Sequence, residues 1–289
     1  MKILVTGSNG FLGRNIKEHL ELSYETHSPK RADLNLLDEK AVEEYLGAHV
    51  FDLVIHCAVK ITALDENIRM FYILEKHSNL YGRMFSLGSG AEFSTTHYIP
   101  KMGEDYLGKN TPSDTYGLSK YVVARFIESS RKEIFNLRLF GIFGKYEDYT
   151  RRFISNNICR ALAGLPISLN QNMFFDFLYI NDFLKLLDMF IHKESLKYKT
   201  YNVCTGFAPD LLSIGEIIRE ATGSTQEILV ASPGHKPEYS GNNRRLLSEI
   251  NGFEFTPLKN SVFELHNWYK ETEDSAIEAY IKSLQFGIQ

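Results

Sequence analysis

The sequence predicts an α/β fold, in which a doubly wound parallel sheet carries a smaller C-terminal lobe. Short apolar runs at residues 2–5 and 52–58 alternate with longer amphipathic stretches. Strands of a parallel sheet are short and nearly all apolar because both faces are covered, whereas the covering helices show one apolar face. A glycine-rich turn at residues 7–13 joins the first run to an amphipathic stretch. The chain therefore begins with a strand, a turn and a helix, as this fold class requires.

The remaining elements are expected to continue this alternation. Apolar runs predict strands, and stretches with one apolar face predict the helices between them. Turn and cap residues at 110–115 precede the long helix in the middle of the chain. We expect strands near 24–27, 52–58, 84–87 and 134–140, and helices near 10–22, 38–46, 116–131, 151–162 and 212–222, with a short helix after residue 245.

The composition is that of a globular protein with a sizeable core. Of 289 residues, 44% are apolar and 24% are charged, which excludes a disordered or low-complexity chain. Basic and acidic residues number 32 and 36, so the net charge of −4 gives no reason to expect nucleic acid or a membrane surface as a partner. No apolar stretch approaches the roughly 18 residues of a membrane span, and the N-terminus has no signal-peptide pattern.

The chain has three cysteines, Cys57, Cys159 and Cys204, and they lie far apart. No pair of them has the spacing of metal ligands, so no metal site is predicted. An odd number of dispersed cysteines suits a reducing compartment, and we expect a cytoplasmic protein.

The glycines of the first turn, Gly7, Gly10 and Gly13, recur at intervals of three residues. Glycine can adopt positive φ and lets the backbone approach a ligand closely. The helix that follows presents free N–H groups and a partial positive charge, which suit a pyrophosphate. A tight turn with glycines for packing is the alternative. The strand before the turn and the helix after it favour a dinucleotide site.

The pattern T-G-x-x-G-x-x-G at residues 6–13 resembles the fingerprint of the extended short-chain dehydrogenase/reductase superfamily. The resemblance implies a Rossmann-type sheet and, within that branch, the NAD-dependent epimerase/dehydratase family. It implies cofactor contacts from the glycine turn, from the loop after the second strand, from the segment after the third strand and from later positions. These residues are Gly7, Asn9, Gly10, Phe11, Leu12, Gly13, Lys30, Arg31, Asp33, Leu34, Cys57, Ala58, Val59, Lys60, Asn67 and Phe140, with Tyr116 and Lys120 of the catalytic helix.

The loop after the second strand bears on the choice of cofactor. In such folds an acidic residue there pairs with the 2′-hydroxyl of NAD, whereas a basic residue accommodates the 2′-phosphate of NADP. Residues 28–31 contain no acid and end in Lys30 and Arg31. The loop therefore favours NADP(H), with NAD(H) as the other possibility. A solvated basic loop is the alternative interpretation.

The chemistry of the superfamily depends on a Ser or Thr and on a Tyr-x-x-x-Lys pair. That spacing places the tyrosine and the lysine on one helix face. Two pairs occur, Tyr72/Lys76 and Tyr116/Lys120, and chance alone accounts for about one. In the family the hydroxyl residue follows the fourth strand and the tyrosine comes after it. Ser89, Tyr116 and Lys120 fit this order, whereas Tyr72 precedes the strand and is interpreted as a core residue of a helix.

These three residues suit reduction of a sugar ketone. A tyrosine has an ordinary pKa of about 10, and a nearby ammonium such as that of Lys120 favours its phenolate. Tyr116 would then exchange a proton with the carbonyl oxygen, which Ser89 would orient by a hydrogen bond. Lys120 would also hold the nicotinamide ribose, and the nicotinamide supplies the hydride. Taken alone, Ser89 could be an ordinary turn residue at the end of a strand.

Three later segments are similar to family segments and extend the resemblance to about residue 270. They are residues 138–144, in which Gly141 replaces the usual Asn, residues 175–182, in which Phe175 replaces the usual Arg, and residues 201–206. The resemblance implies a dinucleotide-binding domain at 1–165, to which 173–205 return. It also implies a substrate lobe at 206–271 with a contribution from 145–172, and leaves 272–289 as a polar tail that could be helical.

Family members with this C-terminal arrangement mostly act on nucleotide-diphosphate sugars and bind the diphosphate between the two parts. Arg151, Arg152, Arg244 and Arg245 are candidates because arginine suits phosphate through its paired donors. We favour Arg152 and Arg244, together with Ser89, as substrate-binding residues. Each arginine could equally be a surface charge. A homodimer is expected from the resemblance alone.

The resemblance is greatest to GDP-fucose synthase-like 4-keto reductases, through residues 32–38 and 87–89. Ala91 stands where fucose synthase has a proton-transferring Cys, which disfavours a 3,5-epimerase step. Gly90 and Ala91 replace the Asp-Glu of the dehydratases, and Glu92, displaced by one position, is expected to point elsewhere. We therefore expect an NADPH-dependent 4-keto reductase, with an NAD-dependent 4-epimerase as the alternative. A dinucleotide-sensing regulatory protein is disfavoured because both Tyr116 and Lys120 are intact.

Overall fold

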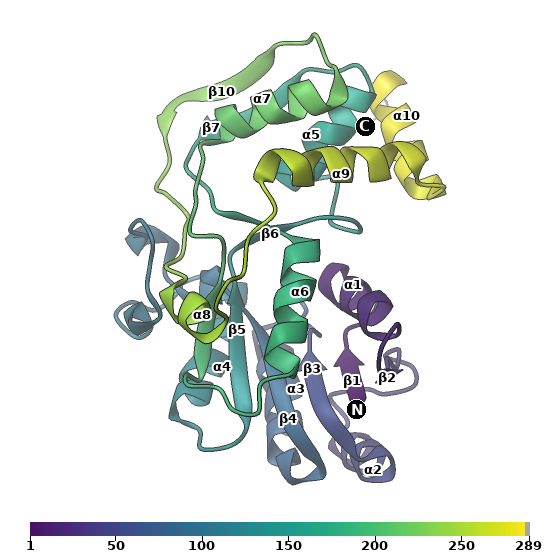
Figure 1. Ribbon diagram of the computed structural model, residues 1–289, viewed down its shortest axis with the longest axis vertical. Helices are drawn as coiled ribbons and strands as arrows, with labels where there is room; N and C mark the ends of the chain where they lie inside the picture. The colour runs from purple at the N-terminus through teal and green to yellow at the C-terminus, as the bar shows by residue number, and fades with distance from the viewer. Residues whose placement is uncertain (287–289) are drawn as a thin grey trace.

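The computed structural model describes residues 1–286, and its larger part is built on a six-stranded parallel sheet (Figure 1). The strand order is β2-β1-β3-β4-β5-β9, and every pairing is parallel. This topology confirms the doubly wound sheet that the sequence predicts. The strands are β1 (Lys2–Thr6), β2 (Glu25–His27), β3 (Phe51–His56), β4 (Tyr81–Ser89), β5 (Ile134–Leu139) and β9 (Thr200–Val203).

Helices cover both faces of the sheet because successive strand residues point to opposite sides. Ile3 and Val5 of β1 belong to the core under one set of helices, whereas Leu4 between them belongs to the core under the other. Both faces are therefore apolar, which explains the continuous apolar runs in the sequence. The first core includes α1 (Phe11–Leu20) and α6 (Ile180–Ile191), and the second includes α2 (Glu39–His49), α3 (Leu64–Lys76) and α4 (Thr115–Ser129).

The strand order reverses between β1 and β3, because β1 lies between β2 on one side and β3 on the other. In open α/β sheets, ligands bind outside the carboxyl ends of the strands at such a point. The glycine turn follows β1, and residues 57–60 follow β3, so the topology brings these two predicted cofactor segments together. Gly7 has a φ of +69°, and a Cβ there would lie 2.6 Å from the backbone nitrogen of Ala58. Glycine is therefore required where the two segments meet.

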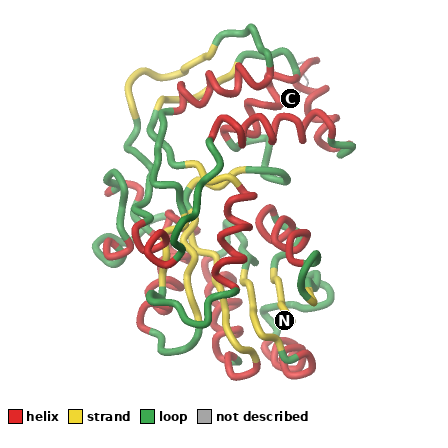
Figure 2. The backbone as a smooth tube through the Cα atoms, viewed as in Figure 1, coloured by secondary structure: helices red, strands yellow, loops and turns green. Residues whose placement is uncertain are grey.

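The smaller lobe is built around a pair of parallel strands. Figure 2 shows that extended segments and loops connect it to the sheet, and β6 (Gly141–Phe143) pairs with β8 (Phe177–Tyr179) along this connection. The buried apolar side chains form one continuous core from the sheet into the lobe. The lobe contains β7 (Ile167–Asn172) and β10 (Ile228–His235), with α5 (Phe153–Leu162), α7 (Leu211–Thr222), α9 (Leu258–Glu271) and α10 (Ser275–Phe286).

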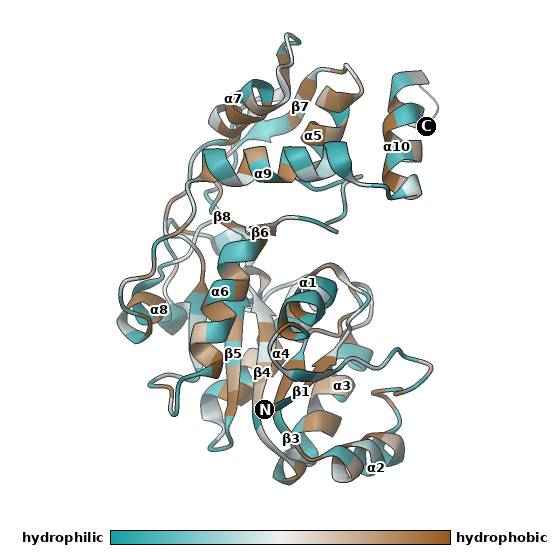
Figure 3. Ribbon diagram, turned by 45° about the vertical axis from the view of Figure 1, so that its right-hand side comes forward, coloured by the Kyte–Doolittle hydropathy of each residue, from teal (hydrophilic) through white to brown (hydrophobic). Residues whose placement is uncertain are grey.

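Two segments lie differently from the expected domain boundaries. Residues 206–271 are not all in the lobe, because α8 (Arg244–Glu249) packs against β9 of the sheet. The expected polar tail contains α10, which packs against α5. Ile277 of α10 is only 2% exposed, and the Asn156 side chain donates a hydrogen bond of 2.9 Å to the Tyr280 hydroxyl. Figure 3 shows both apolar and polar residues on α10, and its apolar face makes it part of the lobe.

Over residues 1–286, the structure contains no helix with the length and apolar character that a membrane crossing needs.

The connection between β6 and α5 contains a buried carboxyl group. Glu147 is 6% exposed, and its carboxyl accepts a hydrogen bond of 2.7 Å from the Ser155 hydroxyl. Burial raises the pKa of Glu147 to about 8, although the Ser155 bond and the Arg152 charge oppose the shift. In the folded protein this carboxyl therefore keeps its proton up to a pH well above 4.5, its ordinary pKa.

Glu147 should make the protein less stable as the pH rises from about 5 to 8. In this window the unfolded state has lost the proton while the folded state keeps it, so unfolding becomes more favourable with increasing pH. Glu147→Gln should remove this loss and raise the free energy of unfolding at pH 8, relative to the wild type, by on the order of 3 kcal/mol. Urea unfolding at pH 5 and pH 8 measures the effect. The exposed Glu227→Gln serves as the control, and an unchanged pH slope in Glu147→Gln would contradict the prediction.

Candidate active site

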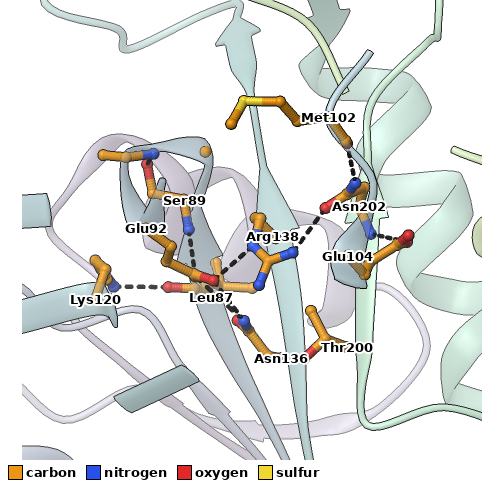
Figure 4. Close-up of polar contacts among 12 residues, drawn as sticks. Leu87, Ser89, Glu92, Met102, Glu104, Lys120, Asn136, Arg138, Thr200 and Asn202 are labelled. Atoms are coloured by element: carbon orange, nitrogen blue, oxygen red, sulfur yellow. Dashed lines mark hydrogen bonds and ion pairs between the residues drawn. The ribbon is translucent and has the colours of Figure 1, made fainter. Parts of the chain in front are cut away.

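The three predicted catalytic residues come together at the carboxyl end of β4. Ser89 is the last residue of β4, and Tyr116 and Lys120 lie in the first turns of α4. The Lys120 ammonium donates a hydrogen bond of 2.6 Å to the backbone oxygen of Leu87, two residues before Ser89 (Figure 4). The same nitrogen lies 6.0 Å from the centre of the Tyr116 ring. The lysine therefore ties the helix that carries Tyr116 to the strand that ends in Ser89.

The start of α4 is fixed by its own cap. The Asp114 carboxylate accepts a hydrogen bond of 2.8 Å from the Gly117 backbone nitrogen, as expected from the cap residues in the sequence. The other Tyr-x-x-x-Lys pair lies elsewhere, on α3, where the Tyr72 ring packs 5.0 Å from the ring of Phe126. Of the two pairs, only the one on α4 adjoins Ser89.

The N-terminus of α1 suits the pyrophosphate of a dinucleotide. Gly10 is its N-cap residue, no side chain caps it, and its first turn contains no acidic residue. In contrast, Asp38, Asp114 and Asp210 cap α2, α4 and α7. The first N–H groups of α1 therefore remain available to an anion. A Cβ on Gly10 would meet only the Gly7 oxygen, at 3.4 Å, so the space beside the turn is open to a ligand.

A buried polar contact holds the glycine turn to the segment after β3. The Thr6 hydroxyl lies 2.9 Å from Nδ1 of His56 and accepts a hydrogen bond from the Ala58 backbone nitrogen. Burial lowers the pKa of His56 to about 3, and the Lys120 charge acts in the same direction. The imidazole is therefore neutral and structural. Burial also raises the pKa of the neighbouring Cys57 thiol to about 12, which makes it unreactive.

The remaining predicted cofactor residues differ in how freely they can reach a ligand. Lys30, Arg31 and Asp33 are exposed after β2, and Val59 and Lys60 are exposed after β3. Asn9 is exposed in the glycine turn, whereas Phe11 and Leu12 are half-buried at the start of α1 and pack against the first core.

Two predicted cofactor contacts, Leu34 and Asn67, have side chains that are engaged within the protein. Leu34 is 5% exposed and packs into the second core, so its side chain is not free for adenine. The Asn67 side chain accepts from the backbone nitrogen of Lys60 and donates to its oxygen, at 2.8 and 2.9 Å. Its amide also donates to the Ser119 hydroxyl. Asn67 thus holds the loop after β3 against α4.

A buried ion pair lies beneath Ser89 (Figure 4). Glu92 is 1% exposed, and its carboxylate accepts hydrogen bonds from the Ser89 backbone nitrogen at 3.0 Å and from the Asn136 side chain at 3.1 Å. The same carboxylate pairs with Nε of Arg138 at 2.5 Å, and Arg138 is fully buried. Glu92 therefore points into the sheet, where it fixes the backbone of Ser89.

This polar cluster continues to distant parts of the chain. Arg138 donates to the Asn202 side chain at 3.0 Å, and Asn202 donates to the backbone oxygens of Met102 and Asn242. Glu104 accepts from the Asn202 backbone nitrogen and lies 3.8 Å from Arg245. The sequence analysis did not predict this cluster, because its members are far apart in the chain. Asn136 and Arg138 in β5 and Asn202 in β9, which are polar residues within otherwise apolar strands, were the signal that could have indicated such a cluster.

An aromatic cluster surrounds Gly90, the residue after Ser89. It contains Phe140, which was predicted to contact the cofactor, and Tyr239, which the sequence analysis missed. Their ring centres lie 5.3 Å apart. Tyr98 donates from its hydroxyl to the Gly90 oxygen at 3.2 Å. These aromatic side chains reach Gly90 from three separate segments of the chain.

The four candidate arginines fall into two groups. Arg151 pairs with Asp148 at 2.7 Å, and Arg245 lies over the Tyr198 ring in addition to its contact with Glu104. Arg152 and Arg244, the two that we favoured, are exposed and form no ion pair within residues 1–286. Arg152 is also the N-cap residue of α5, whose first turn contains no acidic residue. These two arginines remain available to a phosphate.

Known proteins are similar to this chain both in sequence and in structure. The sequence model of the NAD dependent epimerase/dehydratase family matches residues 3–204. GDP-6-deoxy-D-talose 4-dehydrogenase from Aggregatibacter actinomycetemcomitans is 23% identical over 92% of this chain and 97% of its own length. GDP-L-colitose synthase from Yersinia pseudotuberculosis is 38% identical, but over only 24% of this chain and 22% of its own length.

A solved structure supports the fold. The GDP-L-fucose synthetase from Naegleria fowleri, bound to NADP, superimposes with a TM-score of 0.80 at 16% identity and covers 95% of both chains. The family match, which extends over most of the chain, covers the glycine turn, Ser89, Tyr116 and Lys120. The chain therefore belongs to the NAD-dependent epimerase/dehydratase family, the extended short-chain dehydrogenases/reductases that modify nucleotide sugars with NAD(P).

Proposed function

We propose that this protein uses NADPH to reduce the 4-keto group of a nucleotide-diphosphate-linked 6-deoxy sugar. The observation that carries the proposal is the convergence of Ser89, Tyr116 and Lys120 at the end of β4, with Ala91 in place of a second proton-transferring residue. The related talose dehydrogenase acts, by its name, at position 4 of a GDP-6-deoxy sugar. A reduction with a single proton donor is the reaction that this arrangement fits best.

Each residue then has a defined role. When bound, NADPH supplies the hydride. The Ser89 hydroxyl donates a hydrogen bond to the carbonyl oxygen and orients it, and the Tyr116 phenol gives its proton to that oxygen as the C4 hydroxyl forms. The Lys120 ammonium favours the phenolate that remains. Lys120 is held for this role by its hydrogen bond to Leu87.

Positively charged groups are available for the phosphates of both NADPH and the sugar nucleotide. The uncapped N-terminus of α1 would bind the cofactor pyrophosphate, and Lys30 with Arg31 would bind the 2′-phosphate of NADPH. Arg152 and Arg244 would bind the diphosphate of the sugar nucleotide, because both guanidinium groups are exposed.

The cofactor choice can be tested by fluorescence titration. The protein should bind NADPH at least about tenfold more tightly than NADH, and replacing both Lys30 and Arg31 by Ser should remove most of that difference by weakening NADPH alone. Lys40→Ser, at an exposed lysine on α2, is the matched control and should change neither affinity. Protein that purifies with tightly held NAD would contradict the reductase, favour the 4-epimerase, and make the basic loop an ordinary solvated turn.

The proton donor can be tested by removing a single hydroxyl. Tyr116→Phe should lower the rate of NADPH-dependent reduction of nucleotide-linked 4-keto-6-deoxy sugars by at least about 100-fold, because proton transfer is lost. The Kd for NADPH should stay within about twofold. Tyr72→Phe removes the same group from the other Tyr-x-x-x-Lys pair and should leave the rate unchanged.

Two results would overturn the proposed function. Full activity in Tyr116→Phe would remove that residue from the reaction. If no keto sugar is reduced, but a 4-hydroxy nucleotide sugar is interconverted with its C4 epimer without added cofactor, the protein is the epimerase.

A further inference from the structure

Tyr239 reaches the site on a segment that returns from the lobe to the sheet. The Tyr239 backbone nitrogen donates to the Phe174 oxygen at 2.9 Å, and the Tyr239 oxygen accepts from the Asp176 nitrogen at 3.0 Å. On the other side of this segment, Met102 donates to the oxygen of Ser240. Backbone hydrogen bonds on both sides thus fix the position of this segment.

The Tyr239 side chain lies directly against the residue after Ser89. A Cβ on Gly90 would come within 2.3 Å of the Tyr239 hydroxyl, so Gly90 must be a glycine for the phenol to lie there. The ring packs between Tyr98 and Phe175, with centres 5.2 and 4.8 Å away. These contacts direct the hydroxyl toward the end of β4.

The electrostatics of the site make Tyr239 a hydrogen-bond donor. Burial raises the pKa of its phenol well above the usual value, and the nearby phenols of Tyr98 and Tyr116 act in the same direction. The Ser89 hydroxyl is close enough to oppose the shift. Tyr239 therefore keeps its proton and can donate it in a hydrogen bond.

We propose that Tyr239 binds the sugar directly and donates a hydrogen bond to a hydroxyl group on the carbon next to the reacting carbonyl. This inference rests on the proposed function, in which Ser89 and Tyr116 already occupy the two lone pairs of the carbonyl oxygen. Tyr239 is a third donor beside Ser89, and the adjacent C3 hydroxyl is the nearest further oxygen of the substrate that it can serve. Tyr239 is thus a specificity-determining residue that distinguishes 3-hydroxy sugars from 3-deoxy sugars.

The test compares two substrates in two variants. Wild type, Tyr239→Phe and Tyr98→Phe are assayed with GDP-4-keto-6-deoxymannose and with its 3-deoxy counterpart. Tyr239→Phe keeps the ring contacts and should lower kcat/KM about tenfold for the 3-hydroxy sugar, mainly through KM, while the value for the 3-deoxy sugar stays within about twofold. Tyr98→Phe loses a bond to the Gly90 backbone and should affect both sugars equally.

An equal effect of Tyr239→Phe on the two sugars would overturn the inference and leave the proposed reduction intact. If the wild type reduces neither of these two GDP sugars, the proposed reduction is decided with the other nucleotide-linked keto sugars, and the inference is decided by binding. The Kd of the NADP-loaded protein is then measured for GDP-6-deoxymannose and its 3-deoxy counterpart. A tenfold loss of affinity in Tyr239→Phe, confined to the 3-hydroxy compound, supports the contact, and equal affinities in the two proteins rule it out.

Discussion

The buried ion pair between Glu92 and Arg138 joins the end of β4 to the other segments that form the site. Moving two charges out of water costs several kcal/mol for each ion, so such a pair persists only when further hydrogen bonds complete it. Here the Ser89 backbone, Asn136 and Asn202 supply those bonds. Losing Glu92 or Arg138 would leave the other charge buried without compensation, so the pair holds the segment after β4 to β5. The Glu92 carboxylate also fixes the backbone of Ser89.

The topology of the sheet then determines where ligands can lie. The glycine turn follows β1, the segment at 57–60 follows β3, and Ser89 ends β4, and these three strands are neighbours in the sheet. A dinucleotide whose pyrophosphate lies at the N-terminus of α1 can therefore extend along one edge toward Ser89. The sheet sets β1, β3 and β4 side by side, and the ion pair fixes the end of β4 at Ser89.

The sequence predicted correctly those features whose signal lies in residues close together in the chain. A strand, a glycine turn and a helix in succession specify the fold, and the order of strand, Ser89 and Tyr116 selects one of two identical motifs. Asn202 and Tyr239 could not be found in this way, because their partners lie on segments far away in the chain. The sequence allowed a helix in the polar tail after residue 271, but not its place in the lobe, because that depends on the contact of α10 with α5. The roles of the individual site residues stay predictions.

Residues 236–245, the segment that carries Tyr239, separate the residues proposed for sugar recognition from those proposed for the reaction. The residues proposed to act on the carbonyl, Ser89, Tyr116 and Lys120, belong to the sheet and α4, whereas Tyr239 and Arg244 belong to residues 236–245. Side chains in this segment can be exchanged while the backbone bonds to Phe174 and Asp176 remain, since those bonds use main-chain atoms only. With the role proposed for Tyr239, new sugar preferences can evolve in a short stretch of chain without rebuilding the reaction centre.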